Sequence, residues 1–409
     1  MERIAVTGIG VVSPLGCKRE ILWNNLLQGK SGIEAIESLQ DLPVSFGGPA
    51  KDFDPTAYVS SKELRHLDRF SQMALVSGLD AVSQAGIDSA TYPEERIGVL
   101  MGSGAGGIAT LEQQIKIFNE RGPRRISPLT APMFILNIAS GVLAMRIQAK
   151  GPGMGIASAC ATGGHALAVA CRLIQAGDAD CMVAGGVEAC LTPFAVSAFA
   201  AMRALSTRNE EPEKASRPFD RDRDGFVMAE GGAALVLERY SAAKDRGAVI
   251  LAEICGVGMS QDAYHMVAPD PQGTAVAYAM QSALADAGLA PHQIGYINAH
   301  GTSTPLNDPV ETRAIKKVFG DHASELYVSS TKSMTGHLIG GAASLETAIC
   351  ILAMNSSMLP ATINYENADP ECDLKYIPNT AIKAEVNYCL NNSFGFGGQN
   401  LALVIGKGE

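Results

Sequence analysis

Residues 157–167 read Ala-Ser-Ala-Cys-Ala-Thr-Gly-Gly-His-Ala-Leu, and the fold is best worked out from this stretch. It follows a glycine-rich segment and precedes an apolar run, Ala161 to Ala176, that predicts a buried helix. Cys160 is therefore expected at a turn where a helix begins. The unpaired N–H groups and the dipole of a helix start favour a thiolate, which is the nucleophilic form of cysteine. Taken alone, Cys160 is equally interpretable as an ordinary buried cysteine.

The composition is that of a compact, folded protein. The chain has 409 residues, of which 47% are hydrophobic and 18% are charged. The nine cysteines include no Cys-x-x-Cys pair, which argues against a zinc site or a disulfide framework and suits the cytoplasm. A net charge of -10 argues against nucleic acid as a partner. We expect no secretory leader, because Met1 leads directly into a predicted strand at residues 3–8 with no basic-then-apolar segment. We expect no membrane span, because charged residues, Gly or Pro interrupt each apolar run.

The chain contains two internal repeats in the same order. Each pairs a segment of the first half with one of the second, namely residues 80–104 with 283–301 and residues 232–238 with 399–406. The first repeat is a helix closing on Ala-Gly, a loop, and a strand opening with Ile-Gly. Two related α/β halves are therefore predicted, residues 1–250 and 251–409, with loops of both halves around one cleft.

Several local expectations follow from periodicity and composition. One helix is predicted over Lys62–Gly86, and a tight polar turn at residues 391–398. Residues 108–150 are predicted to be helical, with Arg121, Arg124 and Arg125 in a connecting turn. The Gly-x-Gly-x-Gly-Gly run at residues 102–107 follows a predicted strand. It lacks the acidic residue that a dinucleotide site would place further along, so that interpretation is rejected.

Three polar motifs follow predicted strands in the second half. They are residues 298–308, with one histidine and three hydroxyls, residues 332–343, with Lys332 and His337, and residues 391–398. Singly, each has a structural explanation, since a lone histidine is more often structural than catalytic. Together with Cys160 they supply a thiol, two imidazoles, a lysine and glycine-lined N–H groups. Acyl transfer followed by carbon–carbon bond formation needs this set.

With these motifs, the whole chain resembles the β-ketoacyl-[acyl carrier protein] synthases of the thiolase-like superfamily, above all the elongating class of bacterial fatty acid synthesis. The matching motifs are Ala159–Gly163, His300–Pro305, Lys332–His337, Phe394–Gly398, Arg217–Asp220 and Asp222–Phe226. A thiolase would pair its nucleophile with one histidine and a second cysteine, and an initiating enzyme would show Cys-His-Asn. The resemblance implies an α/β thiolase-like fold, with duplicated halves in a five-layered αβαβα arrangement, and a homodimer.

The resemblance also implies a decarboxylative Claisen condensation. Cys160 would accept an acyl chain from acyl carrier protein as a thioester, and the backbone N–H groups of Cys160 and Phe396 would form the oxyanion hole. His300 and His337 would assist loss of carbon dioxide from malonyl carrier protein and stabilise the enolate. The further positions implied are Lys332 and Glu346 for orienting the histidines, Thr302 and Thr304 for the phosphopantetheine arm, and Phe199 and Phe396 as gates of the acyl pocket. No metal or other cofactor is implied, because phosphopantetheine arrives on the carrier protein.

An acidic carrier protein would need a locally basic docking surface. Lys62, Arg65 and Arg69 share one face of the predicted helix, and Arg124, Arg125 and Arg203 are further candidates. The alternative for each is a solvated surface charge. Residues 180–185 and 194–199 are the candidates for a subunit interface.

Two positions depart from the family pattern. Ala105 stands where a bulkier aliphatic residue often faces the acyl pocket, and would admit a longer or bulkier chain. Gln399 stands where threonine is usual, and would reshape the turn holding Phe396 or mark an enzyme of specialised metabolism. Two alternatives thus stay open: a ketosynthase of polyketide or aryl-polyene synthesis, and a non-catalytic chain-length partner subunit. Cys160 and the two histidines argue against the second.

Overall fold

The computed structural model describes residues 2–88 and 90–408. Its main sheet has ten strands in the order β10-β9-β13-β14-β8-β1-β7-β6-β4-β5. In chain order these are β1 (Ile4–Val12), β4 (Ile97–Gly102), β5 (Gly153–Met154), β6 (Cys181–Glu188), β7 (Gly231–Arg239), β8 (Ala252–Gln261), β9 (Tyr296–Asn298), β10 (Tyr327–Ser329), β13 (Tyr388–Gly395) and β14 (Gln399–Lys407). Four short strands form two separate pairs, β2 (Glu34–Ala35) with β3 (Phe46–Gly47) and β11 (Met358–Leu359) with β12 (Ile382–Lys383).

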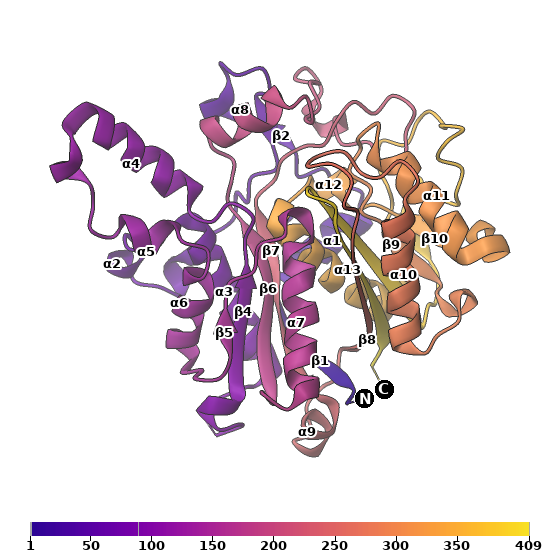
Figure 1. Cartoon of the computed structure of the whole chain (residues 1–409), viewed down its shortest axis with the longest axis horizontal. Coiled ribbons are helices and arrows are strands. Elements are labelled where there is room, and N and C mark those ends of the chain that lie inside the picture. Colours follow the sequence, from indigo (N-terminus) through magenta and orange to yellow (C-terminus); the bar gives the residue numbers. More distant parts are fainter. Residues whose placement is uncertain (1, 89, 409) are drawn as a thin grey trace.

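The strand order repeats between the two halves of the chain. In the first half it is β5-β4-β6-β7-β1, and in the second half β10-β9-β13-β14-β8, so each strand has a counterpart. The halves meet where β1 pairs with β8 over three residues on each side, from Ile4 opposite Ile254 to Val6 opposite Ala252. Figure 1 shows the two halves side by side, the first in indigo to magenta and the second in orange to yellow. The predicted duplication of an α/β unit is confirmed.

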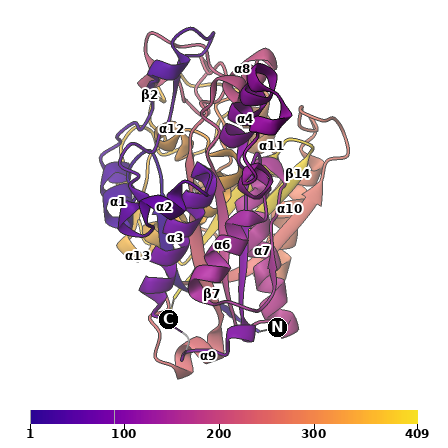
Figure 2. The same ribbon diagram turned by 90° about the vertical axis from the view of Figure 1, so that its left-hand side faces the viewer.

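Helices form the other layers. They are α1 (Arg19–Leu27), α2 (Ser61–Leu64), α3 (Arg69–Ala85), α4 (Ile108–Arg121), α5 (Thr130–Phe134), α6 (Ile138–Ile147), α7 (Thr162–Ala176), α8 (Pro193–Ala201), α9 (Tyr240–Asp245), α10 (Thr274–Ala287), α11 (Asn307–Phe319), α12 (Lys332–Thr335) and α13 (Ala342–Ser356). The central helices α7 and α13 pack against each other and against strands of the sheet, while α3 covers β1, β6 and β7, and α10 covers β8 and β14. Figure 2 shows α4 and α8 at one end of the molecule and α9 at the other.

The inner strands are buried on both faces over most of their length, as the layers require. In β14, Leu401, Leu403 and Ile405 belong to the central core shared with α7 and α13. The alternate residues Ala402 and Val404 belong to the outer core beneath α10. Because successive side chains of a strand point to opposite faces, such a strand is mostly apolar along its whole length. The helical window Ile339–Ser356 is long and apolar enough to cross a membrane, but 83% of it is buried in this core.

Three local predictions were wrong or incomplete. The helix expected over residues 62–86 is divided, because Asp68 caps the start of α3 by accepting a hydrogen bond from the Phe70 N–H at 3.2 Å. In the region 108–150, the turn expected at Arg121, Arg124 and Arg125 does follow α4, but the second division, between α5 and α6, was not predicted. Most of the turn expected at residues 391–398 is strand, since β13 continues to Gly395. Asn391 is tolerated inside β13 because its Nδ2 donates to Ala343 and Thr347 of α13, both at 2.9 Å.

The interface expected at residues 180–185 is also contradicted. This segment enters β6, which pairs with β4 on one side and β7 on the other and is buried along its whole length. The edge of this half of the sheet is instead β5, whose two residues are exposed. An inner strand is apolar because helices cover both of its faces, so its sequence resembles that of an interface.

Candidate active site

Cys160 lies in a short 3-10 turn, Ala159–Ala161, that leads into α7. Ala159 adopts a left-handed backbone conformation, with φ of 49°, which turns the chain sharply. Gly395 of β13 packs directly on this turn, where a Cβ would lie 2.7 Å from the Ser158 carbonyl oxygen. The glycine therefore lets the strand that leads to Phe396 approach the nucleophile.

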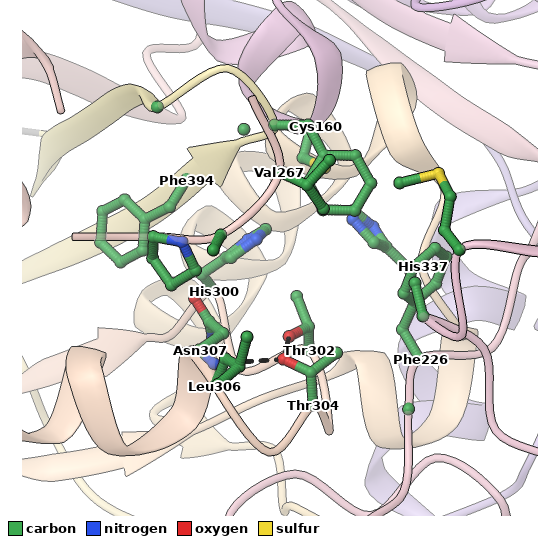
Figure 3. Close-up of a pocket in the computed structure, with 18 of the residues that line it drawn as sticks. Cys160, Phe226, Val267, His300, Thr302, Thr304, Leu306, Asn307, His337 and Phe394 are labelled. Carbon is green, nitrogen blue, oxygen red and sulfur yellow. Dashed lines mark hydrogen bonds between the residues drawn. The ribbon is translucent and has the colours of Figure 1, made fainter. Parts of the chain in front are cut away.

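The structure brings Cys160, His300 and His337 together from three separate segments. His300 follows β9 and His337 follows α12, and the centroids of their rings are 5.5 Å apart. One side-chain nitrogen of each ring and the Cys160 Sγ all lie within 4.8 Å of one another. Figure 3 shows the two imidazoles on either side of a cavity, with Cys160 at one end of it. All three side chains are buried, so their chemistry takes place away from bulk water.

Both histidines are neutral in this environment. Burial lowers the pKa of His300 and of His337 well below the usual value of 6.5, and the nearby Lys332 charge lowers both further. Nδ1 of His337 accepts a hydrogen bond from the Ile339 N–H at 3.3 Å, so the ring hydrogen is on Nε2. This Nε2 is buried and has no partner among the described residues. His337 can therefore donate a hydrogen bond to a group that enters the cavity.

The Cys160 thiol is harder to ionise than its position predicts. Burial raises its pKa to about 11, while the Phe396 N–H, the Lys332 charge and the N–H of Cys160 itself act in the opposite direction. The N–H groups at the helix start do favour the thiolate, as expected, but the loss of hydration on burial outweighs them, so the net shift of the pKa is upward. The two N–H groups nevertheless face the sulfur, where the oxyanion hole was predicted.

Lys332 and Glu346 form a buried ion pair beneath the site. The Lys332 Nζ is 2.5 Å from Glu346 Oε1, and both side chains are at most 3% exposed. Within residues 2–88 and 90–408, neither hydrogen-bonds an imidazole ring. Burial raises the pKa of Glu346 to about 7, although Lys332 lowers it. The Lys332 charge lowers the pKa of both histidines, and the expected role of Lys332 and Glu346 in orienting the rings stays a prediction.

Two cavities meet at Cys160. One has a volume of about 260 Å³ and is lined by both histidines, and the other has a volume of about 190 Å³ and is almost entirely apolar. Cys160 and Phe396 are the two residues that line both. A group bound in one cavity can therefore reach a chain bound in the other only past these two side chains.

The predicted substrate contacts are distributed between the two cavities. Thr302 and Thr304 line the larger one (Figure 3), and their Oγ1 atoms are 2.9 Å apart. Ala105 and Phe199 line the apolar one. The rings of Phe199 and Phe396 lie 6.4 Å apart at 31°, so two aromatic side chains stand where the cavities join.

Sequence motifs did not point to Glu311 or Asp262. Glu311 of α11 is fully buried and accepts hydrogen bonds from the backbone N–H groups of His300 and Gly301, both at 2.8 Å. Asp262 accepts a hydrogen bond from Asn400 Nδ2 at 2.6 Å and joins the loop after β8 to the glycine turn. The one signal in the sequence for Glu311 is an acidic residue on the otherwise buried side of a helix.

The predicted docking residues are mostly available to solvent. Five are exposed, namely Lys62, Arg65, Arg124, Arg125 and Arg203, and Arg203 also lines the larger cavity. Arg69 is different, because its guanidinium is paired with the buried Glu230 at 2.5 Å. The expectation that Lys62, Arg65 and Arg69 share one helical face is wrong, since α2 ends before α3 begins.

The chain belongs to the β-ketoacyl synthase family of carbon–carbon bond-forming acyltransferases. The family model described as "Beta-ketoacyl synthase, N-terminal domain" matches residues 1–243, and that described as "Beta-ketoacyl synthase, C-terminal domain" matches residues 251–366. Both the predicted family and the predicted thiolase-like fold are confirmed.

Among curated relatives, the chain is similar to two proteins named 3-oxoacyl-[acyl-carrier-protein] synthase 2. The one from Coxiella burnetii is 48% identical over 408 residues, which covers 99% of each chain. The one from Synechocystis is 46% identical and covers 99% of this chain and 98% of the relative. Among solved structures, a ketosynthase in complex with its type II polyketide acyl carrier protein has 34% identity and a TM-score of 0.92 over the full length of both chains.

Proposed function

We propose that this enzyme elongates fatty acids by condensing an acyl chain, held on Cys160, with malonyl carrier protein. The observation that carries the proposal is the position of Cys160, which lies at the junction of an apolar cavity and a cavity lined by two neutral histidines. The apolar cavity suits the acyl chain, and the larger one suits the phosphopantetheine arm. The relatives named 3-oxoacyl-[acyl-carrier-protein] synthase 2 support the same reaction.

In the first half-reaction, Cys160 Sγ attacks the thioester carbon of the acyl carrier protein. The carbonyl oxygen becomes an oxyanion, which the backbone N–H groups of Cys160 and Phe396 stabilise by hydrogen bonds. The carbon–sulfur bond to phosphopantetheine breaks, and the thiol proton passes to the departing sulfur. The products are an acyl-Cys160 thioester and free carrier protein. Because the pKa of the resting thiol is about 11, this proton must move as the substrate binds and not before.

In the second half-reaction, malonyl carrier protein enters the larger cavity. Loss of carbon dioxide leaves an enolate, whose oxygen accepts hydrogen bonds from the His300 and His337 rings. The enolate carbon attacks the acyl thioester, the bond to Cys160 Sγ breaks, and the sulfur recovers a proton. β-Ketoacyl carrier protein leaves. A neutral His337 suits this step, because its Nε2–H, free among the described residues, can donate to a developing charge without the ring being strongly acidic.

Lys332, Glu346 and the two threonines have supporting roles in this proposal. Burial keeps both histidines neutral, and the Lys332 charge, itself held by Glu346, lowers their pKa further. Thr302 and Thr304 line the larger cavity within reach of the amide groups of a phosphopantetheine arm. Phe199 and Phe396 act as gates, since they stand between the two cavities.

The proposed partners are an acidic carrier protein and a second copy of the chain. Exposed basic residues for the carrier are Lys62, Arg65, Arg124, Arg125 and Arg203. The second copy would cover the exposed edge strand β5 and the apolar side chains Leu111, Ile115, Phe118, Ile135, Met145 and Met154. We place the enzyme in the cytoplasm. The proposal involves no nucleic acid, membrane, metal or free cofactor, and a metal bound by Cys160, His300 and His337 would block the nucleophile.

The test is mass spectrometry of the protein incubated with acyl carrier proteins that carry different chains. Wild type should gain the mass of one acyl group, Cys160→Ser should gain none as a thioester, and malonyl carrier protein should remove the gain. Absence of acylation with every carrier would contradict the proposal and leave the role of a partner subunit. Preferential loading of polyketide or aryl-polyene intermediates would assign the enzyme to specialised synthesis. The likeness in fold to polyketide ketosynthases makes that comparison necessary.

A further inference from the structure

Glu188, at the end of β6, joins two loops that approach the active site from opposite halves of the chain. Its side chain is fully buried. Oε1 accepts hydrogen bonds from Ser103 Oγ at 2.7 Å and from the Ala105 N–H at 3.1 Å. Oε2 accepts from the Gly104 N–H at 2.8 Å and from the Gly340 N–H at 3.0 Å. One carboxylate thus holds the loop after β4 against the turn before α13.

Both of these loops line the apolar cavity. Ala105 comes from the loop after β4 and Ile339 from the turn before α13. The N–H of Ile339 is also the group that donates to His337 Nδ1 and so keeps the ring hydrogen on Nε2. The same residue is therefore a wall of the acyl cavity and the hydrogen-bond partner of a catalytic ring. The Glu188 bond to Gly340 is one peptide away from it.

The turn at Ile339 holds a conformation that needs support from its surroundings. Ile339 has φ of 45°, a left-handed value that is strained for a β-branched residue. The space beside it is filled, since a Cβ on Gly340 would lie 2.8 Å from Glu188 Oε2 and 2.6 Å from the Gly104 nitrogen. Such a conformation persists only when neighbouring contacts fix it, and Glu188 supplies a charged contact.

The internal repeat gives this contact a further meaning. The turn Ile339–Gly341 precedes the 15-residue helix α13 as the turn Ala159–Ala161 precedes the 15-residue helix α7. The first residue of each turn has a left-handed φ, 45° and 49°. Gly340 therefore occupies in the second half the position of Cys160 in the first. In the second half, the N–H of this turn, that of Gly340, donates a hydrogen bond to the Glu188 carboxylate of the protein itself.

We propose that Glu188 is a positioning residue that couples the wall of the acyl cavity to His337. An acyl chain that presses on Ala105 and Ile339 then sets the His337 ring for the second half-reaction. This inference rests on the proposed function. Loading of Cys160 uses the oxyanion hole of Cys160 and Phe396. Glu188 affects the thiol only through its charge, the last of the causes that shift the Cys160 pKa, so loading should depend little on Glu188. Decarboxylation and condensation, which use His337, depend on it.

The test is Glu188→Gln, which preserves size but turns an NH₂ group toward two hydrogen-bond donors. The rates of acyl loading and of condensation are measured separately in single-turnover experiments. We expect loading to stay within about twofold of wild type and condensation to slow about tenfold or more. An equal loss in both steps, or none in either, would overturn the coupling. A wild type that neither loads nor condenses would instead overturn the proposed function.

The matched control is Glu238→Gln. Glu238 is also a fully buried carboxylate, but it accepts hydrogen bonds from Tyr92 at 2.6 Å and from Arg246 at 2.6 and 2.7 Å, away from both cavities. This variant should lower the thermal midpoint and leave the ratio of the two rates unchanged. A change of that ratio in both variants would show that general destabilisation, not Glu188, controls the second step.

A second variant tests the coupling if Glu188→Gln fails to fold. Ile339→Ala removes side-chain contact with the acyl chain but retains the backbone N–H that binds His337. In wild type, the condensation rate of a loaded enzyme should depend on the length of the chain on Cys160, and in Ile339→Ala this dependence should flatten. The ¹⁵N signal of the His337 ring, recorded with short and long chains on Cys160, reports the same coupling directly. An unchanged ring signal and an undiminished chain dependence would contradict it.

Discussion

The ammonium group of Lys332 and the carboxylate of Glu346 lie 2.5 Å apart in the interior, at the base of the site. Removing one member of such a pair leaves the other without a partner, away from water. We expect Lys332→Met to lower the free energy of unfolding by about 3–5 kcal/mol. Condensation should slow as well, because the positive charge beside the two histidines, which adds to burial in lowering their pKa, is gone from the site where the enolate forms. Chemical denaturation and single-turnover rates measure the two effects.

The loss of stability in Lys332→Met should depend on pH. Lys332 lowers the pKa of Glu346, so without it the folded-state pKa rises further above the present value of about 7. A carboxyl with a raised folded-state pKa stabilises the protein at low pH, and this contribution is lost as pH rises through that pKa. The variant should therefore fall further below wild type at about pH 8 than at about pH 5.5. Lys150→Met, which removes an exposed pair with Glu94, should show no such trend.

The histidine pKa values predict a second, independent pH effect. Because burial holds the pKa of His300 and His337 well below 6.5, both rings stay neutral as pH falls from about 8 to 6. Release of carbon dioxide from malonyl carrier protein should therefore show no inflection near the usual histidine pKa. Replacing either ring by alanine removes one donor and should slow this release about 10²–10³-fold. The exposed His292 is the control, and His292→Ala should release carbon dioxide at the wild-type rate.

The duplicated fold could be predicted because each repeat combines a helix end and a strand start in the same order. Residues 80–104 contain the end of α3 and the strand β4, and the matching residues 283–301 contain the end of α10 and the strand β9. The structure adds that all five strands of the main sheet in one half have counterparts in the other, which no single sequence motif reveals. We propose residue 250 as the boundary of the two halves, just before β8 begins.

The site was less predictable where a property depends on contacts distant in sequence. The turn holding Cys160 could be read from small residues before an apolar helix, but its thiol pKa depends on burial by the other half of the chain. Arg69 has the sequence context of a docking residue, yet Glu230 pairs with it from 161 residues away. Glu188 has no motif at all, because all four of its donors come from segments outside β6.

The small side chain of Ala105 predicts that the apolar cavity accepts long acyl chains. Ala105 lines the apolar cavity beside Ile108 and Phe199, so Ala105→Ile adds three carbon atoms to the space an acyl chain would fill. Loading of the longest accepted chain should fall about tenfold, and loading of short chains should be unaffected. Mass spectrometry with mixed acyl carrier proteins gives both rates at once. Ala285→Ile, on the exposed surface of α10, should leave the preference unchanged, and an unchanged preference in Ala105→Ile would contradict the assignment of the cavity.

The two kinds of basic residue predicted for carrier docking should behave differently when they are replaced. Arg125 is exposed and makes no ion pair within the described chain, so Arg125→Ala should lower kcat/KM for the carrier protein several-fold and leave stability unchanged. The difference in kcat/KM between wild type and Arg125→Ala should shrink as salt is added, because salt screens the attraction between Arg125 and the acidic carrier protein in wild type. Arg69→Ala should instead lower the thermal midpoint, since Glu230 is only 7% exposed and would lose its partner. Equal salt dependence of kcat/KM in wild type and Arg125→Ala would place the carrier on another surface.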